Sequence, residues 1–287
     1  MLAKITRHLT TIVVTLLLGA FFSAAMLRSA PGANVDEQQL DPRLNARSIQ
    51  ALRQSRVQEQ NLIGFYFHYL NQALHGDLGT SHTLGQPVSS LIRDRAPVTA
   101  RIVVLGLGLG WTLAVGLSFT AALMRTTTCD VTTMVTSGLF LCFPAAGLAL
   151  LSVLLNTPGY LAIGLIVFPK VFRYLRNLMS KAFSLPHIQT ARAKGLSELR
   201  ILVFHVLPVI APEILALAGV SVSIAVGASI PIETLCGLAG VGQLAWQAAL
   251  GRDLPLLVNI TVLVTIVTLA ANLSADVASH LLKAEAA

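Results

Sequence analysis

Charge is scarce in this sequence, and so are the motifs that mark most enzymes. Only 11% of the 287 residues are charged and 6% are aromatic. The sequence contains no Gly-x-x-x-x-Gly-Lys-Ser/Thr phosphate-binding loop, so the chain cannot hydrolyse ATP by the usual route. Its 3 cysteines are scattered and odd in number, which predicts neither a disulfide framework nor a metal site. No catalytic constellation stands out either. We therefore expect a protein that is not an enzyme and carries no cofactor of its own.

Hydrophobic residues, in contrast, make up 54% of the chain, and the mean hydropathy is +0.73. This apolar content exceeds that of a typical soluble domain and indicates an integral membrane protein. Such a chain has to be all-α, because a bilayer offers no partner to unpaired backbone polar groups. The formal net charge of +7 fits cytoplasmic loops and anionic lipid. No run combines basic side chains with exposed aromatics, so we expect contact with the lipid bilayer and no binding of nucleic acid.

Six apolar segments predict six transmembrane helices. We place them at residues 9–27, 98–124, 131–155, 160–172, 209–230 and 256–282. The first segment could instead be a cleavable signal peptide, since small residues occur at 24–25 and 29–30, but its apolar run is long for that purpose. In the second segment, Gly106 and Gly110 form a small-xxx-small pair that should let another helix approach closely, whereas Leu109 should face elsewhere.

The segments between the spans predict the topology. Residues 35–97 form the one extended hydrophilic region, with an amphipathic helix expected at 61–75. We place this region outside, because long loops cross the membrane regardless of their charge. From Lys170 to Arg200, seven cations stand against a lone Glu198, which indicates the cytoplasmic side. With six spans, both termini are then cytoplasmic too.

Residues 185–208 are a polar island between two apolar segments. Pro186 can open a helix, because the amide that it lacks would be unpaired in the first turn anyway. Gly195 offers the left-handed residue that commonly ends a helix. Ser197 can cap a second helix that runs up to Pro208. The polar island therefore predicts two short helices joined at a glycine and lying outside the hydrocarbon.

The spacing within the polar island resembles a known motif. Gln189-Thr-Ala191, then Gly195 after three residues, then His205-Val-Leu-Pro208 after nine more, resembles the "EAA" loop of ABC-transporter membrane subunits. Residues 190–198 are similar to the form found in bacterial dipeptide, oligopeptide and nickel importer permeases. Further similarities to these permeases are the segments 30–32, 76–81, 87–88, 231–245 (rich in glycine and expected outside) and 252–255, together with Arg95, Pro97, Asn272 and Asp276.

This resemblance implies a type I ABC importer permease-like bundle, a single transmembrane permease domain over 1–287, in the bacterial inner membrane. The implied function is that of a membrane-spanning subunit of an ATP-driven importer, with peptides as the expected substrates. The implied partners are a second homologous permease, two ATPase subunits that bind ATP and Mg, and an extracytoplasmic substrate-binding protein. Segment 28–97 would be an extracytoplasmic loop and 177–208 a cytoplasmic coupling loop. The residues that would dock on the ATPase are Gln189, Thr190, Ala191, Arg192, Ala193, Lys194, Gly195, Leu196, Leu207 and Pro208.

Polar residues inside the predicted spans are candidates for lining a transport pathway. They are Ser221, Ser223, Asn259 and Thr265, although serine and threonine also bond helices to one another. Two other functions stay open. A secondary transporter usually shows paired repeats with interrupted helices and an ionisable site at the midplane, neither of which is clear here. A scaffold subunit of a membrane complex would have no need of an ATPase cleft for the polar island.

Overall fold

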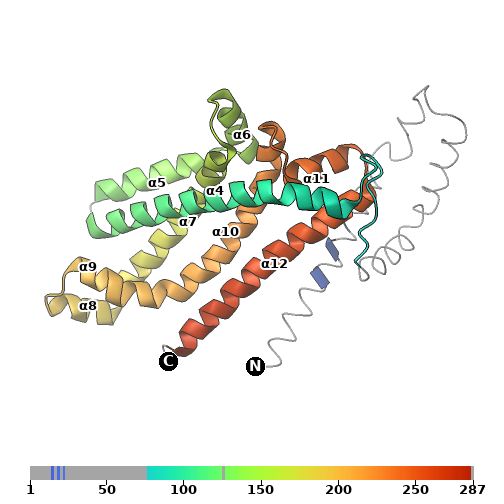
Figure 1. Ribbon diagram of the computed structural model, residues 1–287. Coiled ribbons are helices and arrows are strands. Elements are labelled where there is room, and N and C mark those ends of the chain that lie inside the picture. The colour runs from blue at the N-terminus through green and yellow to red at the C-terminus, as the bar shows by residue number, and fades with distance from the viewer. Residues whose placement is uncertain (1–13, 16–17, 20–21, 23–75, 125–126, 286–287) are drawn as a thin grey trace, which may run out of the picture. The chain divides into compact units, whose positions relative to one another are not determined.

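The computed structural model describes residues 76–124 and 127–285, together with positions 14, 15, 18, 19 and 22. The remainder of the predicted first span, the hydrophilic segment up to residue 75 and the amphipathic helix expected at 61–75 lie outside the described residues. Within the described ranges the regular secondary structure is helical (Figure 1). One isolated antiparallel bridge joins Thr80 to Pro87. The predicted all-α class is confirmed.

Ten helical segments follow one another in the described part of the chain. They are α4 (Val88–Met124), α5 (Thr127–Cys142), α6 (Ala145–Leu154), α7 (Gly159–Phe183), α8 (Pro186–Ala193), α9 (Glu198–Ile201), the π-helical turn η2 (Leu202–Val206), α10 (Leu207–Leu235), α11 (Val241–Leu250) and α12 (Leu254–Glu285).

The chain divides into two compact units. The first consists of Met1–Arg95 and Leu244–Ile266, and the second of Ala96–Gln243 and Val267–Ala287. In the second unit α7 packs against α5, α6 and α10, and α10 also contacts α6 and η2. More than half of the residues of α7 are buried, among them Ile163, Phe172 and Leu175. Helix α7 is therefore the centre of this unit's core.

Three helices in the described ranges are long and apolar enough to cross a membrane: Val88–Leu123, Glu198–Leu235 and Leu254–Leu282. A fourth crossing results if the bent pair Val131–Cys142 and Ala145–Leu154 is one broken span. These helices confirm the membrane-protein class. The total of six spans, which includes the segment at 9–27, stays a prediction.

The third predicted span, 131–155, is wrong as a single helix. The chain bends by 90° between α5 and α6. Pro144 stands at the bend in an extended conformation (φ −68°, ψ 152°). Proline has no N–H to donate to the preceding turn, and its ring disfavours helical angles at the residue before it. The bend therefore follows from the residue that the straight-span prediction had placed inside one helix.

The fourth predicted span, 160–172, is too short. Helix α7 continues to Phe183, eleven residues further. Beyond Phe172 it keeps an apolar stripe, because Leu175, Met179 and Ala182 are all buried. The cations that had suggested an early end lie among these residues on other faces of the same helix. Burial of one stripe thus extends the helix through a basic stretch.

The glycine pair of α4 packs against α7, as predicted. A Cβ atom at Gly106 would lie 2.6 Å from Ile163 Cβ, and one at Gly110 would lie 3.0 Å from the carbonyl oxygen of Gly164. The expectation that Leu109 faces elsewhere is wrong. A Cβ at Gly164 would lie 2.8 Å from Leu109 Cδ2, so Leu109 fills the space that the third glycine leaves on α7.

The glycine-rich segment 231–245 was expected to be one exterior loop, and it is mostly helical. Residues 231–235 form the last turn of α10, and α11 begins at Val241. Only 236–240 connect the two helices, and Gly237 in this connection has φ +65°. Proline at 231 does not end α10, since a helix tolerates proline where packing supports the backbone groups that it frees.

Candidate functional site

Helix α8 has one buried and one exposed face. It begins at Pro186, directly after the N-cap residue Leu185. Ile188 and Ala191, three positions apart and therefore on one face, are 0% and 5% exposed. The exposed residues are polar or small: His187, Gln189, Thr190, Ala193 and Lys194. The buried face fixes the helix to the protein, and the polar face is left for solvent or a partner.

A Schellman motif ends α8 at the predicted glycine. Gly195 has φ +78°, its N–H donates to the carbonyl of Arg192 at 2.9 Å, and the N–H of Leu196 donates to the carbonyl of Ala191 at 3.3 Å. A Cβ atom at Gly195 would meet no atom within 4 Å. The requirement for glycine here is therefore one of backbone conformation and not of space.

An ion pair joins α8 to α9 across this turn. Arg192 Nε donates to Glu198 Oε1 at 2.7 Å, and a terminal nitrogen of the same guanidinium donates to Oε2 at 3.1 Å. The two side chains are each 34% exposed. The hydrogen bonds to Glu198 raise the pKa of Arg192, against a small opposing effect of burial, so the guanidinium stays charged. The pair is bidentate, the geometry in which arginine binds a carboxylate with most specificity.

The second short helix begins where the sequence predicts, but it does not end at Pro208. Ser197 caps α9, its Oγ accepting the N–H of Arg200 at 3.4 Å. The helix then continues through η2 into α10, and the N–H of Leu207 donates to the carbonyl of Leu202, five residues back. A π turn adds one residue to the helical turn and so shifts the register of the backbone hydrogen bonds. The shift comes just before Pro208, which has no N–H to donate. The predicted helix end at Pro208 is therefore wrong.

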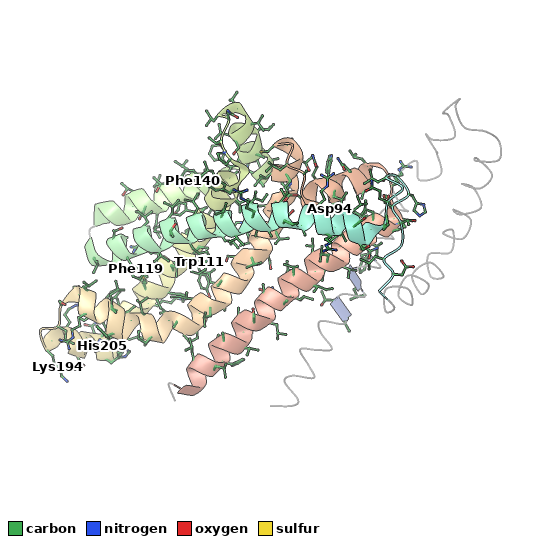
Figure 2. All side chains as sticks on the ribbon, in the orientation of Figure 1. Asp94, Trp111, Phe119, Phe140, Lys194 and His205 are labelled. Carbon is green, nitrogen blue, oxygen red and sulfur yellow. The ribbon has the colours of Figure 1, made fainter. Side chains whose placement is uncertain are left out.

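A hydrophobic cluster lies beneath the polar island. Met179 and Phe183 from α7 pack with Ile188 and Ala191 from α8, and with buried residues of α9, η2 and α10: Ile201, Leu202, Val206 and Ile210. Figure 1 shows α8 and α9 at the end of α7 where α10 starts, and Figure 2 locates Lys194 and His205 there. The arrangement is a pair of short helices anchored on one side and exposed on the other.

The predicted pathway residues of α10 bond to neighbouring helices. Trp111 of α4 donates its Nε1–H to Ser221 Oγ at 3.0 Å, and Ser221 is 1% exposed. Asn272 of α12 donates to Ser223 Oγ at 3.4 Å. Both serines therefore hold helices of the second unit together, which is the other role that this residue type serves inside a membrane.

The predicted pathway residues of α12 lie in the first unit. Asn259 is 4% exposed and donates to the carbonyls of Leu78 at 2.9 Å and of Pro255 at 2.8 Å. Thr265 donates its hydroxyl to the carbonyl of Thr261 at 2.7 Å. Asn259 thus ties the segment before α4 to the first turns of α12.

Sequence reasoning missed a buried carboxylate in the first unit. Asp253 is 0% exposed, and its Oδ2 accepts the hydroxyl of Ser81 at 2.6 Å and both the hydroxyl and the N–H of Thr83 at 2.9 and 3.0 Å. Its Oδ1 accepts the N–H of Leu256 at 3.1 Å and so caps α12. Burial raises the pKa of Asp253, but these hydrogen bonds outweigh burial and hold the pKa below its ordinary value.

A second buried carboxylate organises the connection between α10 and α11. Glu233 is 0% exposed, and its Oε2 accepts the N–H groups of Gly242 at 2.6 Å and Gln243 at 3.2 Å. These are unpaired donors of the first turn of α11, so Glu233 caps that helix from α10. A Cβ at Gly240 would overlap the carboxylate. In the sequence, this contact shows only as an acidic residue seven positions before a Gly-x-Gly pair. Local sequence rules do not predict that such a residue caps the helix after the pair.

Comparison with known proteins places the chain in a family. Residues 93–285 match the family model described as "Binding-protein-dependent transport system inner membrane component". The oligopeptide transport system permease protein OppB of Escherichia coli is 31% identical over 287 residues, and the match covers 92% of each chain. OppB of Shigella flexneri matches with the same identity and coverage.

The fold is also similar to a solved transporter. An inward-facing structure of the MetNI methionine ABC transporter superposes with a TM-score of 0.60 at 17% identity, covering 67% of this chain and 96% of that chain. The family match extends over more than half of the residues, and it agrees with the motif in the polar island and with the helical fold. The chain therefore belongs to the binding-protein-dependent transport system inner membrane components, the membrane permease subunits of ABC importers, whose ATPase resides in separate subunits.

Proposed function

We propose that this chain is a permease subunit that imports peptides across the bacterial inner membrane and is coupled to ATP hydrolysis through the polar island, residues 185–208. It pairs with a second homologous permease to form the translocation pathway. Two ATPase subunits, which bind ATP and Mg, dock on the cytoplasmic side, and an extracytoplasmic binding protein delivers the substrate. Both termini lie in the cytoplasm, and segment 28–97 lies outside.

The relatives support peptides as the substrate class. The two OppB proteins are named for oligopeptide transport, and each match covers 92% of this chain. The methionine transporter shares the fold at an identity of 17%, so it supports the architecture and carries no weight for the substrate.

The amphipathic construction of α8 is the observation that carries the coupling role. Its apolar face is fixed on the hydrophobic cluster through Ile188 and Ala191, while its polar face is exposed. A helix held in this way transmits a push from a docked partner into α7 and α10, because both contribute to the same cluster. The exposed face is formed by residues of the proposed docking set, Gln189, Thr190, Ala193 and Lys194. Ala191, Leu196 and Leu207 support that face from the buried side.

Two substitutions of Gly195 test the coupling role. Valine is strained at φ +78°, since the left-handed conformation costs about 1 to 2 kcal/mol, whereas asparagine adopts this conformation readily. No neighbouring atom obstructs either side chain. We expect Gly195→Val to insert in the membrane and pair with the second permease but to lose substrate uptake and ATPase docking. Gly195→Asn should keep both. Normal uptake by the valine variant would remove the polar island from the mechanism.

Uptake by the reconstituted transporter tests the substrate class. The permease pair, the ATPase subunits and the binding protein are assembled in proteoliposomes and offered di- to pentapeptides, free amino acids or Ni²⁺. We expect ATP-dependent accumulation of peptides. Accumulation of Ni²⁺ or amino acids alone would contradict the peptide proposal and leave the permease assignment intact. Accumulation without ATPase subunits would favour the secondary transporter, and an inert complex would favour the scaffold.

The proposed pathway residues are tested in the same assay. Ser221, Ser223, Asn259 and Thr265 are polar positions of α10 and α12, and the two serines hold helices together. If they also line the pathway, Thr265→Val should change the relative uptake of peptides with different side chains while the protein assembles normally. Unchanged selectivity would exclude Thr265 from the pathway.

A further inference from the structure

Neither α8 nor α9 can be rigid without outside support. Helix α8 has eight residues and α9 has four. Isolated helices of this length are unstable, because helix nucleation costs more than a few hydrogen bonds return. The buried contacts of Ile188, Ala191 and Ile201 support their inner sides. On the partly exposed side, the ion pair between Arg192 and Glu198 joins the two helices.

This ion pair is selective within its surroundings. Residues 170–208 contain seven cations and a single carboxylate, that of Glu198. Lys194 and Arg200 lie closer to Glu198 along the chain than Arg192 does, yet Arg192 holds the carboxylate with two hydrogen bonds. Its planar fork fits a carboxylate in a way that a lysine ammonium cannot. The guanidinium of Arg192 is thereby bound within the polar island, whereas Lys194 and Arg200 are exposed and form a basic surface.

We infer that Arg192 and Glu198 are positioning residues: together they clamp α8, the Gly195 turn and α9 into one rigid element, and this element docks on the ATPase. The inference rests on the proposed coupling function and deepens it. It adds Glu198 to the residues required for coupling, and it makes the contribution of Arg192 indirect. It also adds α9 to the docking element, whose Leu199 is 58% exposed and offers an apolar contact beside the basic surface.

Charge reversal and charge exchange test the clamp in the assembled transporter. Arg192→Glu and Glu198→Arg each place like charges opposite one another, whereas the double variant restores an ion pair of reversed direction. The measurement is the affinity of the purified ATPase subunit for the permease pair in proteoliposomes, with membrane insertion and permease pairing checked for each variant. We expect each single reversal to weaken docking by about five-fold, the upper range for a partly exposed pair. The double variant should recover most of this loss.

A neighbouring cation supplies the matched control. Lys194→Glu changes the charge by the same amount on an exposed residue, and combining it with Glu198→Arg should restore less docking than the Arg192→Glu combination, because Arg192 is the residue that holds the Glu198 carboxylate with two hydrogen bonds. Arg192→Lys keeps the positive charge but lacks the planar fork of arginine. Its affinity for the ATPase subunit should therefore lie between the affinities of the wild type and of Arg192→Glu.

The outcomes separate the clamp from the coupling function itself. A double variant as defective as Arg192→Glu would show that Arg192 contacts the ATPase directly, and it would overturn the clamp while coupling stands. Wild-type docking in both single reversals would overturn it too. If Gly195→Val also docks normally, the proposed coupling function fails along with the clamp.

Discussion

The contact between α4 and α7 allows a prediction with its control on the same helix. Gly106 and Gly108 are two residues apart in α4 and differ in their surroundings. A Cβ at Gly106 would lie 2.6 Å from two carbon atoms of Ile163 and 3.0 Å from the carbonyl oxygen of Tyr160. A Cβ at Gly108 would meet nothing within 4 Å. Alanine therefore fits at Gly108 and forces a shift of α7 at Gly106.

Gly106→Ala and Gly108→Ala make the same chemical change and differ in whether the added Cβ atom clashes with α7. Alanine improves intrinsic helix propensity over glycine by about 0.8 to 1 kcal/mol at both positions, so this gain cancels in the comparison. Overpacking a close contact costs about 1 to 3 kcal/mol, and the carbonyl oxygen on one side prevents relief by a change of rotamer alone. We expect Gly106→Ala to be less stable than Gly108→Ala by about 1 to 3 kcal/mol.

The measurement is the free energy of unfolding of the purified protein in mixed micelles, titrated with a denaturing detergent and followed by tryptophan fluorescence. Trp111 lies in α4 and bonds to Ser221 of α10, so its signal reports on the packing of this unit. Equal unfolding free energies for the two variants would show that α4 and α7 are not in close contact at Gly106. A less stable Gly108→Ala would contradict the assignment of faces on α4.

Three further predictions concern other parts of the chain. The pKa of Asp253 is lowered in the folded state, so the stability that its carboxylate contributes is fully present above the ordinary pKa of about 3.8 and is lost as the pH falls through the lowered pKa. Asp253→Asn should lack this contribution at all pH values, which proteolysis of segment 76–87 between pH 3 and 7 measures. Gly240→Ala should destabilise the start of α11 by about 1 to 3 kcal/mol because its Cβ would overlap the Glu233 carboxylate, and hydrogen exchange of the α11 amides measures this. In a variant without the native cysteines, a cysteine at Ser197 should react with an impermeant maleimide only from the cytoplasm, and one at Gln86 only from outside; labelling of both from one side would refute the proposed topology.

The polar island shows which features a sequence specifies locally. Pro186 at the first helical position, Gly195 with positive φ and the Ser197 cap were all predicted, and all are present. Each depends on the backbone preferences of one residue and its nearest neighbours along the chain. Such preferences act in the same way whatever the rest of the protein does. The site's location and its family resemblance were therefore accessible from the sequence.

The prolines show where local rules stop. Pro144 produces a 90° bend, whereas Pro208 lies in a helix that continues, with a π turn just before it. Both residues lack the same N–H, so the difference comes from their surroundings. Around Pro208, buried Leu202, Val206 and Ile210 hold the helix on the hydrophobic cluster. This cluster was not visible from the sequence, because its members come from α4, α7, α8, α9, η2 and α10.

The sequence by itself determined the helical membrane class, the polar island and the ends of its first helix, because apolar content and backbone preferences are properties of short stretches. Only the tertiary structure decided which groups meet. It paired Glu198 with Arg192 among seven cations, and it brought Asp253 to Ser81 across 172 positions of the chain. Partners of this kind are selected by how separate segments of the chain pack together, and the energy of each pair depends on a distance that no local pattern records.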